Sequence, residues 1–142
     1  MTALGDFSAG DVLTAADLNA IGIWTSYNAT VSQGGSSVSL STNAGYYIQI
    51  NELVIARFFL SANATGSAND LIVSLPVNTG SNSSVMMGPA SVFDASVGSQ
   101  TIGTWFRNSA STIDMSVEPS GRYDTALGNG DVIRGVIMYE VA

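Results

Sequence analysis

The feature that most constrains the fold is a series of short segments with strand-forming patterns, separated by stretches rich in turn-forming residues. The expected strands cover residues 23–31, 37–41, 46–50, 53–61, 71–75, 91–95, 101–107, 111–117 and 131–141. Glycine, asparagine, serine and proline gather between them, where a chain can reverse direction. Many short strands in 142 residues are typical of an all-β domain. The sequence therefore predicts a jelly-roll-like β-sandwich with a short N-terminal helix.

The N-terminal residues differ from the rest because they carry the pattern of that helix. Thr14 is a good N-cap, Asp17 can complete a capping box, and Gly22 is a residue type that ends helices. A helix of two turns is marginal alone, so its apolar side must dock on this domain, on another copy or on a different protein. We therefore divide the chain into an N-terminal anchor segment, residues 1–22, and a β-sandwich domain, residues 23–142.

Composition argues against most catalytic and nucleic-acid-binding classes. The chain has no cysteine, histidine or lysine, and its four arginines oppose eleven carboxylates, for a net charge of −7. Thiolate, Ser-His-Asp and Schiff-base chemistry are therefore absent, and four cations are too few to neutralise a nucleic-acid backbone. The longest apolar run, residues 53–60, is far shorter than the roughly 20 residues that span a bilayer. We expect no enzyme activity, no cofactor or metal, and no nucleic-acid or membrane partner.

Carboxylates are the one catalytic class that composition leaves open. Asp94, Asp114, Glu118 and Asp124 could supply the acid and base of a glycosidase, or three of them could offer oxygen ligands to calcium. No spacing brings a pair together, and the Asp-x-Asp-x-Asp-Gly pattern of calcium loops is missing. We expect these residues to be exposed at strand ends and turns.

Two expected strands differ in their apolar pattern. Residues 131–141 alternate, with Ile133 and Tyr139 on one face, which predicts a half-buried strand where Gly135 marks a close approach or a bulge. Residues 53–60 are instead apolar on both faces apart from one arginine. Because a small sandwich covers only one face of each sheet, the second apolar face predicts association between copies. The candidate interface residues are Val54, Phe58 and Leu60.

Two arginines stand beside aromatic residues in the sequence. Arg107 follows the pair Trp105-Phe106, and Arg122 precedes Tyr123. An arginine next to an aromatic ring can recognise a glycan through stacking and forked hydrogen bonds. The alternative is that the rings fill the core while the arginines form surface or interface ion pairs.

Residues 7–21 read Phe-Ser-Ala-Gly-Asp-Val-Leu-Thr-Ala-Ala-Asp-Leu-Asn-Ala-Ile. This run resembles a segment common near the start of tailed-bacteriophage virion proteins, where it precedes a β-rich domain in tail-fibre, minor tail and head-decoration proteins. Residues 24–27, 45–47, 71–76 and 130–133 are also similar to pieces of such proteins.

The resemblance implies a non-enzymatic virion structural protein, either a capsid decoration protein or a head-fibre knob, held on the particle by its N-terminal segment. The anchoring residues would be Phe7, Val12, Leu13, Leu18 and Ile21. Its partners would be other phage structural proteins of the capsid or tail and further copies of the chain, with a trimer favoured. We expect synthesis in the host bacterial cytoplasm and a final place on the virion surface. The alternative is a tail-fibre or minor tail module that binds host surface glycan through the two arginine–aromatic pairs.

Overall fold

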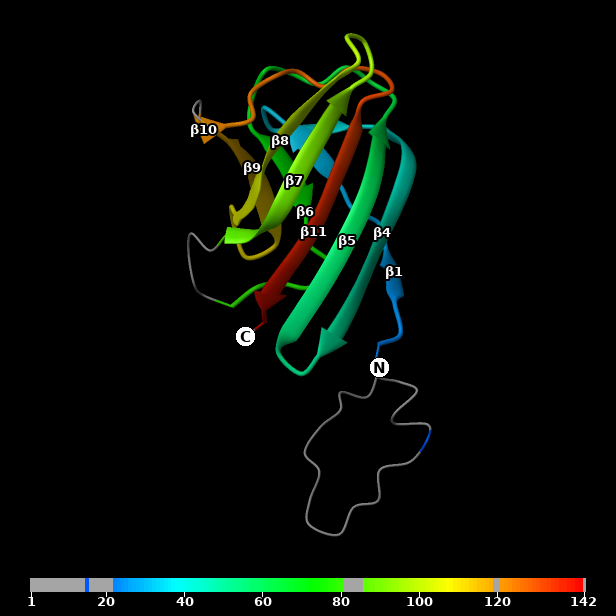
Figure 1. Cartoon of the computed structure of the whole chain (residues 1–142), viewed down its shortest axis with the longest axis vertical. Helices are drawn as coiled ribbons and strands as arrows, with labels where there is room; N and C mark the ends of the chain where they lie inside the picture. Colours follow the sequence, from blue (N-terminus) through cyan, green and yellow to red (C-terminus); the bar gives the residue numbers. More distant parts are fainter. Residues whose placement is uncertain (1–14, 16–21, 81–85, 119–120, 142) are drawn as a thin grey trace.

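The computed structural model describes residue 15 and residues 22–80, 86–118 and 121–141. These residues form eleven β-strands (Figure 1). The strands are β1 (Thr25–Tyr27), β2 (Val31–Gln33), β3 (Ser36–Val38), β4 (Leu40–Ile50), β5 (Leu53–Ala62), β6 (Leu71–Ser74), β7 (Met86–Asp94), β8 (Ser99–Arg107), β9 (Thr112–Val117), β10 (Gly121–Arg122) and β11 (Val132–Glu140). The expected N-terminal helix lies outside the described residues. Within these ranges no helix has the length and apolar character needed to cross a membrane.

All eleven strands belong to one antiparallel sheet, which confirms the predicted all-β class. Its order is β1-β4-β5-β11-β7-β8-β9-β6-β2-β3, and β10 pairs with β9. The sheet curls strongly into a half-barrel, so that β4, β5, β11 and β7 form the near half in Figure 1 while β9 and β6 lie behind them. The described strands do not separate into the two sheets of a sandwich. The reason is that β8 pairs with β7 along its length and with β9 over its last four residues, Thr104 to Arg107.

The start of the described chain departs from the expected strands. A single strand was expected over residues 23–31, but β1 and β2 lie near opposite edges of the sheet. The chain crosses between them at Ala29, whose amide and carbonyl both bond to the Asn43 side chain, at 3.1 and 2.7 Å. The turn expected between strands 37–41 and 46–50 lies inside β4. Gly45 serves a different purpose there, because a Cβ at this position would collide with the ring of Tyr27.

The core lies inside the curled sheet, and alternate residues of the central strands point into it. We call this side of the sheet the inner face. Ile133, Ile137 and Tyr139 of β11 are buried there, while the residues between them are exposed or glycine, which confirms the predicted alternation. The Trp105 ring is fully buried and meets Phe58 edge-on, with ring centroids 5.4 Å apart.

Gly135 faces the core directly beneath these two aromatic rings. A Cβ at Gly135 would collide with both Trp105 and Phe58. The Trp105 indole N–H also donates to the carbonyl oxygen of Arg134, at 3.3 Å. The predicted close approach at this glycine is therefore confirmed, and it allows the largest core side chain to pack against the strand.

The predicted oligomer interface residues lie on the inner face instead. Val54, Phe58 and Leu60 have exposed fractions of 0%, 3% and 0%, so they are core residues and cannot contact another copy. The other side of the same strand presents Arg57 and Phe59 to solvent. The prediction that β5 has a second apolar face is therefore kept, but the interface was assigned to the wrong face. Apolar alternation separates two faces without saying which one is covered.

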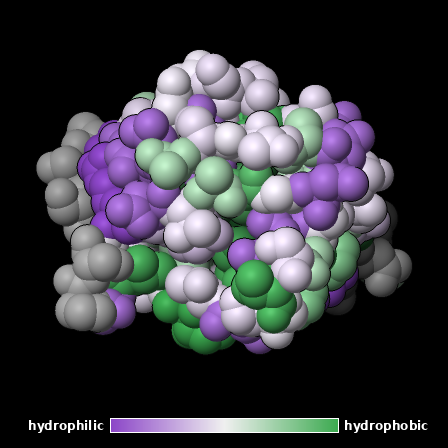
Figure 2. Space-filling model, turned by 90° about the horizontal axis from the view of Figure 1, so that it is seen from above, coloured by the Kyte–Doolittle hydropathy of each residue, from purple (hydrophilic) through white to green (hydrophobic). Residues whose placement is uncertain are grey.

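Buried polar side chains tie the loops together at one end of the sheet. The Gln33 side chain donates to the carbonyl oxygens of Asn69 and Thr125, and its own oxygen accepts from the Leu127 amide at 2.9 Å. Asp131 accepts from the amides of Ala95 and Gly128, at 2.9 and 2.7 Å. Seen from this end (Figure 2), the surface is mostly of intermediate hydropathy, with hydrophilic patches on opposite sides. The hydrogen bonds of Gln33 and Asp131 therefore connect the loops and stabilise the fold.

Candidate functional site

The most unusual surface of the molecule is the solvent side of β4, β5, β11, β7 and β8, which we call the outer face. Strand pairing aligns its residues in rows across the sheet. Phe59 lies opposite Arg134, which in turn lies opposite Ser91. The next row pairs Tyr46 with Arg57 and Arg57 with Val136. The register therefore places aromatic, aliphatic and arginine side chains side by side on one exposed surface.

Large apolar side chains are exposed across this face. The exposed fraction is 41% for Phe59, 52% for Val136, 56% for Met138 and 65% for Ile102. A shallow groove of about 540 Å³ lies on this face and is lined by Phe59, Val136 and Ile102 of this set, together with Tyr46. A contiguous apolar patch of this kind on a soluble domain is typical of a contact surface, whereas single exposed apolar residues are not informative.

Two of the four arginines stand on the outer face and stack on its rings. The Arg57 Cζ atom lies 4.6 Å from the centre of the Trp24 ring and 5.5 Å from that of Tyr46. The Arg134 Cζ atom lies 5.3 Å from the Phe59 ring centre. In the part of the chain that the structure describes, every ion pair involves Arg122, so these two guanidinium groups have no carboxylate partner there. Such groups are available for a charged partner.

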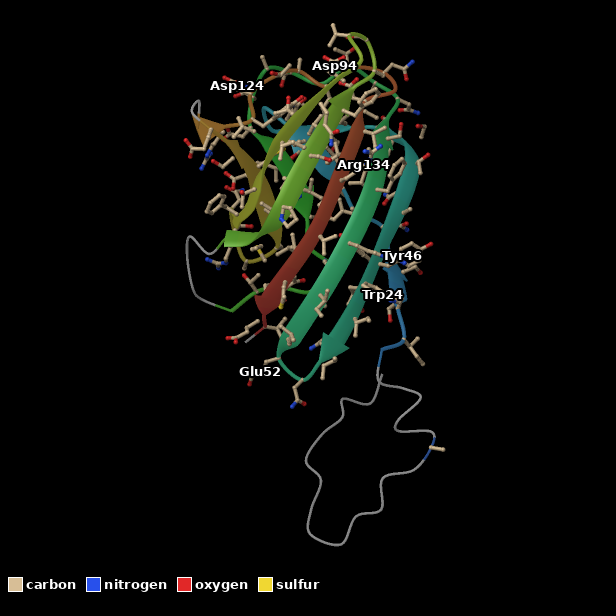
Figure 3. The ribbon with its side chains drawn as sticks, in the orientation of Figure 1. Trp24, Tyr46, Glu52, Asp94, Asp124 and Arg134 are labelled. Carbon is tan, nitrogen blue, oxygen red and sulfur yellow. The ribbon has the colours of Figure 1, made fainter. Side chains whose placement is uncertain are left out.

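Carboxylates mark the opposite end of the same face. Figure 3 shows Arg134 well up the sheet, Trp24 and Tyr46 beside each other, and Glu52 at the lower end, in the turn between β4 and β5. The Glu52 carbonyl accepts from the Val141 amide at 2.7 Å, which holds this turn beside the end of β11. Glu140, the last residue of β11, is exposed close by. The outer face is therefore positive in one half and negative at its lower end.

The four residues predicted to contact glycan do not form a surface site. Trp105 and Tyr123 have exposed fractions of 0% and 4%, so neither ring can stack on a ligand at the surface, and burial raises the pKa of Tyr123 to about 12. The Arg107 Nε–H donates to the Thr79 hydroxyl at 2.6 Å. The Trp105 ring packs against Phe58 in the core and does not reach the surface.

Arg122 is held by two aspartates. It contacts Asp70 directly, and its Nε atom lies 3.1 Å from an Asp114 oxygen. The hydrogen bond that Arg122 donates to Asp70 and the charges of both carboxylates raise the pKa of the Arg122 guanidinium. This is the ion-pair alternative considered for the arginines from the sequence.

The carboxylates considered as catalytic or calcium-binding candidates are not brought together. Asp94 accepts from the Ser96 hydroxyl and from the amides of Ser96 and Val97, and the hydroxyl bond lowers its pKa. Burial raises the pKa of Asp114, and the Arg122 charge opposes that rise. Glu118 and Asp124 are exposed. Over residues 22–80, 86–118 and 121–141 no three acidic side chains are grouped to hold a metal ion.

The remaining predicted site residues, Phe7, Val12, Leu13, Leu18 and Ile21, lie outside the described residues. Phe59, Val136 and Arg134 of the outer face were missed as site residues. The sequence of β5 could have indicated this surface. Arg57 interrupts the apolar run, and strand alternation places Phe59 on the same side as Arg57. Comparison with protein-family models, curated proteins and solved structures finds no match for this chain.

Proposed function

We propose that this chain is a non-enzymatic structural protein of a tailed-bacteriophage particle, a capsid decoration protein or head-fibre knob attached through its N-terminal segment. The observation that carries the proposal is the outer face, where a contiguous apolar surface holds two arginines without a carboxylate partner among the described residues. A subunit of an assembly needs such a contact surface. The resemblance of residues 7–21 to virion proteins supplies the phage context.

The use of the polar side chains supports a structural role. Gln33 and Asp131 bind backbone groups of loops, and Asp114 pairs with Arg122, so the buried polar residues serve the fold. We also propose that the fold is jelly-roll-like. The two halves of the curled sheet enclose one core, as the two layers of a sandwich do. A domain of this kind can present a surface without supplying reactive groups.

The test is attachment to the particle. Particles lacking the protein are incubated with the purified chain or with a version that lacks residues 1–21, and bound protein is located by cryo-electron microscopy. We expect the intact chain to bind in many copies over the head. The truncated chain should keep its β circular dichroism and fail to bind. Equal binding of the truncated chain would refute the anchor, and absence of the protein from native particles would refute the phage assignment.

The alternative function is recognition of a host surface glycan at the tail. It is favoured by Trp24 and Tyr46, two exposed aromatic residues that flank Arg57 on the outer face. Exposed rings beside a guanidinium group can stack on a sugar and bond to its hydroxyls. A glycan-array signal that Trp24→Ala abolishes and Ile23→Ala preserves would support this function, together with a location at the tail tip. A chain that binds no glycan would exclude it.

A further inference from the structure

The exposed side chains of β11 run from a positive charge through apolar residues to a negative charge. Two copies of this strand therefore complement each other when they run in opposite directions. Along the outer face the strand presents Arg134, Val136, Met138 and Glu140, which are positive, apolar, apolar and negative. When two such strands lie antiparallel, face to face, the positive end of each meets the negative end of the other. The apolar residues then meet in the middle.

We propose that a second copy of this chain packs on the outer face through a two-fold axis that crosses β11 near Ile137. In a two-fold contact the same surface serves both subunits, so each pairing occurs twice. Arg134 of one copy then faces Glu140 of the second copy, and the reverse pair forms at the other end. Val136 faces Met138 in the same way, and the two apolar residues exclude water from the centre.

The neighbouring strand fits the same axis. Pairing with β11 places Phe59 level with Arg134 and Leu53 level with Glu140, so the axis brings Phe59 of one copy over Leu53 of the other. It likewise brings Arg57 over Ile55, since these residues lie level with Val136 and Met138. The aromatic half of each face therefore covers the aliphatic half of its partner. Sheets that pack in this aligned way lie about 10 Å apart.

The groove supplies room for this contact. Its lining includes Arg134 and Val136, which the axis places opposite Glu140 and Met138 of the second copy, and Phe59, which it places opposite Leu53. Met138 protrudes with an exposed fraction of 56%, so it can enter the groove while Glu140 reaches the guanidinium group of Arg134. A protruding side chain in one half and a hollow in the other are what a self-complementary face requires.

The size of the face predicts a concentration-dependent dimer. Nine residues of β11 span about 30 Å, and five strands spaced about 4.8 Å apart span about 20 Å. Each copy therefore offers roughly 600 Å², and a total near 1,200 Å² lies at the lower end of specific interfaces. The charge order favours a dimer over the trimer expected from the sequence, because a three-fold contact joins two different surfaces. The inference rests on the proposed function only in taking the outer face as a contact surface, so purified protein tests it without particles.

The experiment is a charge exchange in the intact chain, followed by sedimentation velocity over a range of concentrations at low salt. We expect wild type to dimerise. Arg134→Glu and Glu140→Arg should each weaken dimerisation by about tenfold or more, because each creates like-charge pairs at both ends of the contact. The double variant Arg134→Glu/Glu140→Arg restores opposite charges and should return the dissociation constant to near the wild-type value. Glu118→Arg makes the same charge change on an exposed residue at the end of β9 and should have no effect.

Circular dichroism of each variant confirms that the sheet is retained. Four results would overturn the proposal: a wild-type monomer at all concentrations, a wild-type trimer, single variants that dimerise as wild type does, or a double variant that stays as weak as the single variants. If the dimer test fails, the proposal that the protein attaches to particles still stands. If particle attachment fails while the charge-exchange variants dimerise as expected, only the proposed function is refuted.

Discussion

The two faces of β5 and β11 share one backbone and are both rich in apolar residues, yet one is buried and the other is exposed. On the inner face every side chain of these strands is uncharged and buried, from Val54 to Ala62 and from Ile133 to Tyr139. On the outer face Arg57 and Arg134 stand among exposed apolar residues. The comparison teaches that apolar content alone does not identify a core face. The position of the charged residues does.

The largest test of this comparison uses two adjacent phenylalanines. Phe58→Ala should lower the free energy of unfolding by about 3–5 kcal/mol, because it empties space beside Trp105 in the core. Phe59→Ala should lower it by less than about 1 kcal/mol, because its ring is already 41% exposed. Urea denaturation at a fixed protein concentration measures both variants. Equal losses of free energy of unfolding would mean that the two faces of β5 contribute equally to stability.

Alkaline pH tests the inner face through its tyrosines. Burial raises the pKa of Tyr27 and Tyr139 and raises that of Tyr123 to about 12. Above about pH 10 the unfolded chain releases these protons while the folded chain keeps them, so the stability present at neutral pH is lost as pH rises. We expect a loss of about 1 kcal/mol for each of the three groups between about pH 9 and 11. Urea denaturation at several pH values measures it, and a flat profile would contradict the burial of these rings.

A smaller test separates two buried hydroxyls. The Tyr139 hydroxyl donates to the Val77 carbonyl oxygen at 2.8 Å, whereas the buried Tyr27 hydroxyl has no partner within the described residues. Tyr139→Phe should therefore lower the free energy of unfolding by about 1–2 kcal/mol, and Tyr27→Phe should leave it unchanged or raise it slightly. Thermal denaturation compares the two variants directly. Equal destabilisation would show that the Tyr27 hydroxyl is satisfied in solution.

The smallest expected effect belongs to the outer face. Arg57→Gln removes the stacking on Trp24 and Tyr46, and at an exposed site this costs about 0.5–1 kcal/mol. The Trp24 ring should also shift its fluorescence emission. Arg134→Gln is the matched control, since Arg134 stacks on Phe59 and should leave the emission of Trp24 unchanged. The same shift in both variants would mean that the signal reports the fold rather than the local contact.

Local pattern predicted the regular strands well, but not their partners. The expected strands 53–61 and 101–107 agree with β5 and β8 within two residues, because β-branched and aromatic residues between turn signals mark them. The expected strand 23–31 failed because its two ends pair with segments far apart in the sequence, β4 and β6. Strand pairing is a long-range property, and neither the crossing at Ala29 nor the single curled sheet leaves a mark in local sequence.

The candidate site was harder to predict for a related reason. Trp105 and Tyr123 were assigned to a surface because each stands close to an arginine in the sequence, but both rings are buried in the core. Phe59 and Val136 come from strands separated by many residues and become neighbours only through the pairing of β5 with β11. The outer face is therefore a product of register, which the sequence alone does not define.

The place of β11 in the sheet has a consequence for the order of synthesis. β11 is the last of the eleven strands, yet it lies between β5 and β7. A ribosome releases the chain from its N-terminus at about 5–20 residues per second, so β5 and β7 leave the ribosome before the strand that joins them exists. A chain that stops before residue 132 has neither a closed core nor the centre of the outer face. Truncated products are thereby kept out of any assembly built on this face, because the strand that completes folding is also the strand that other copies would bind.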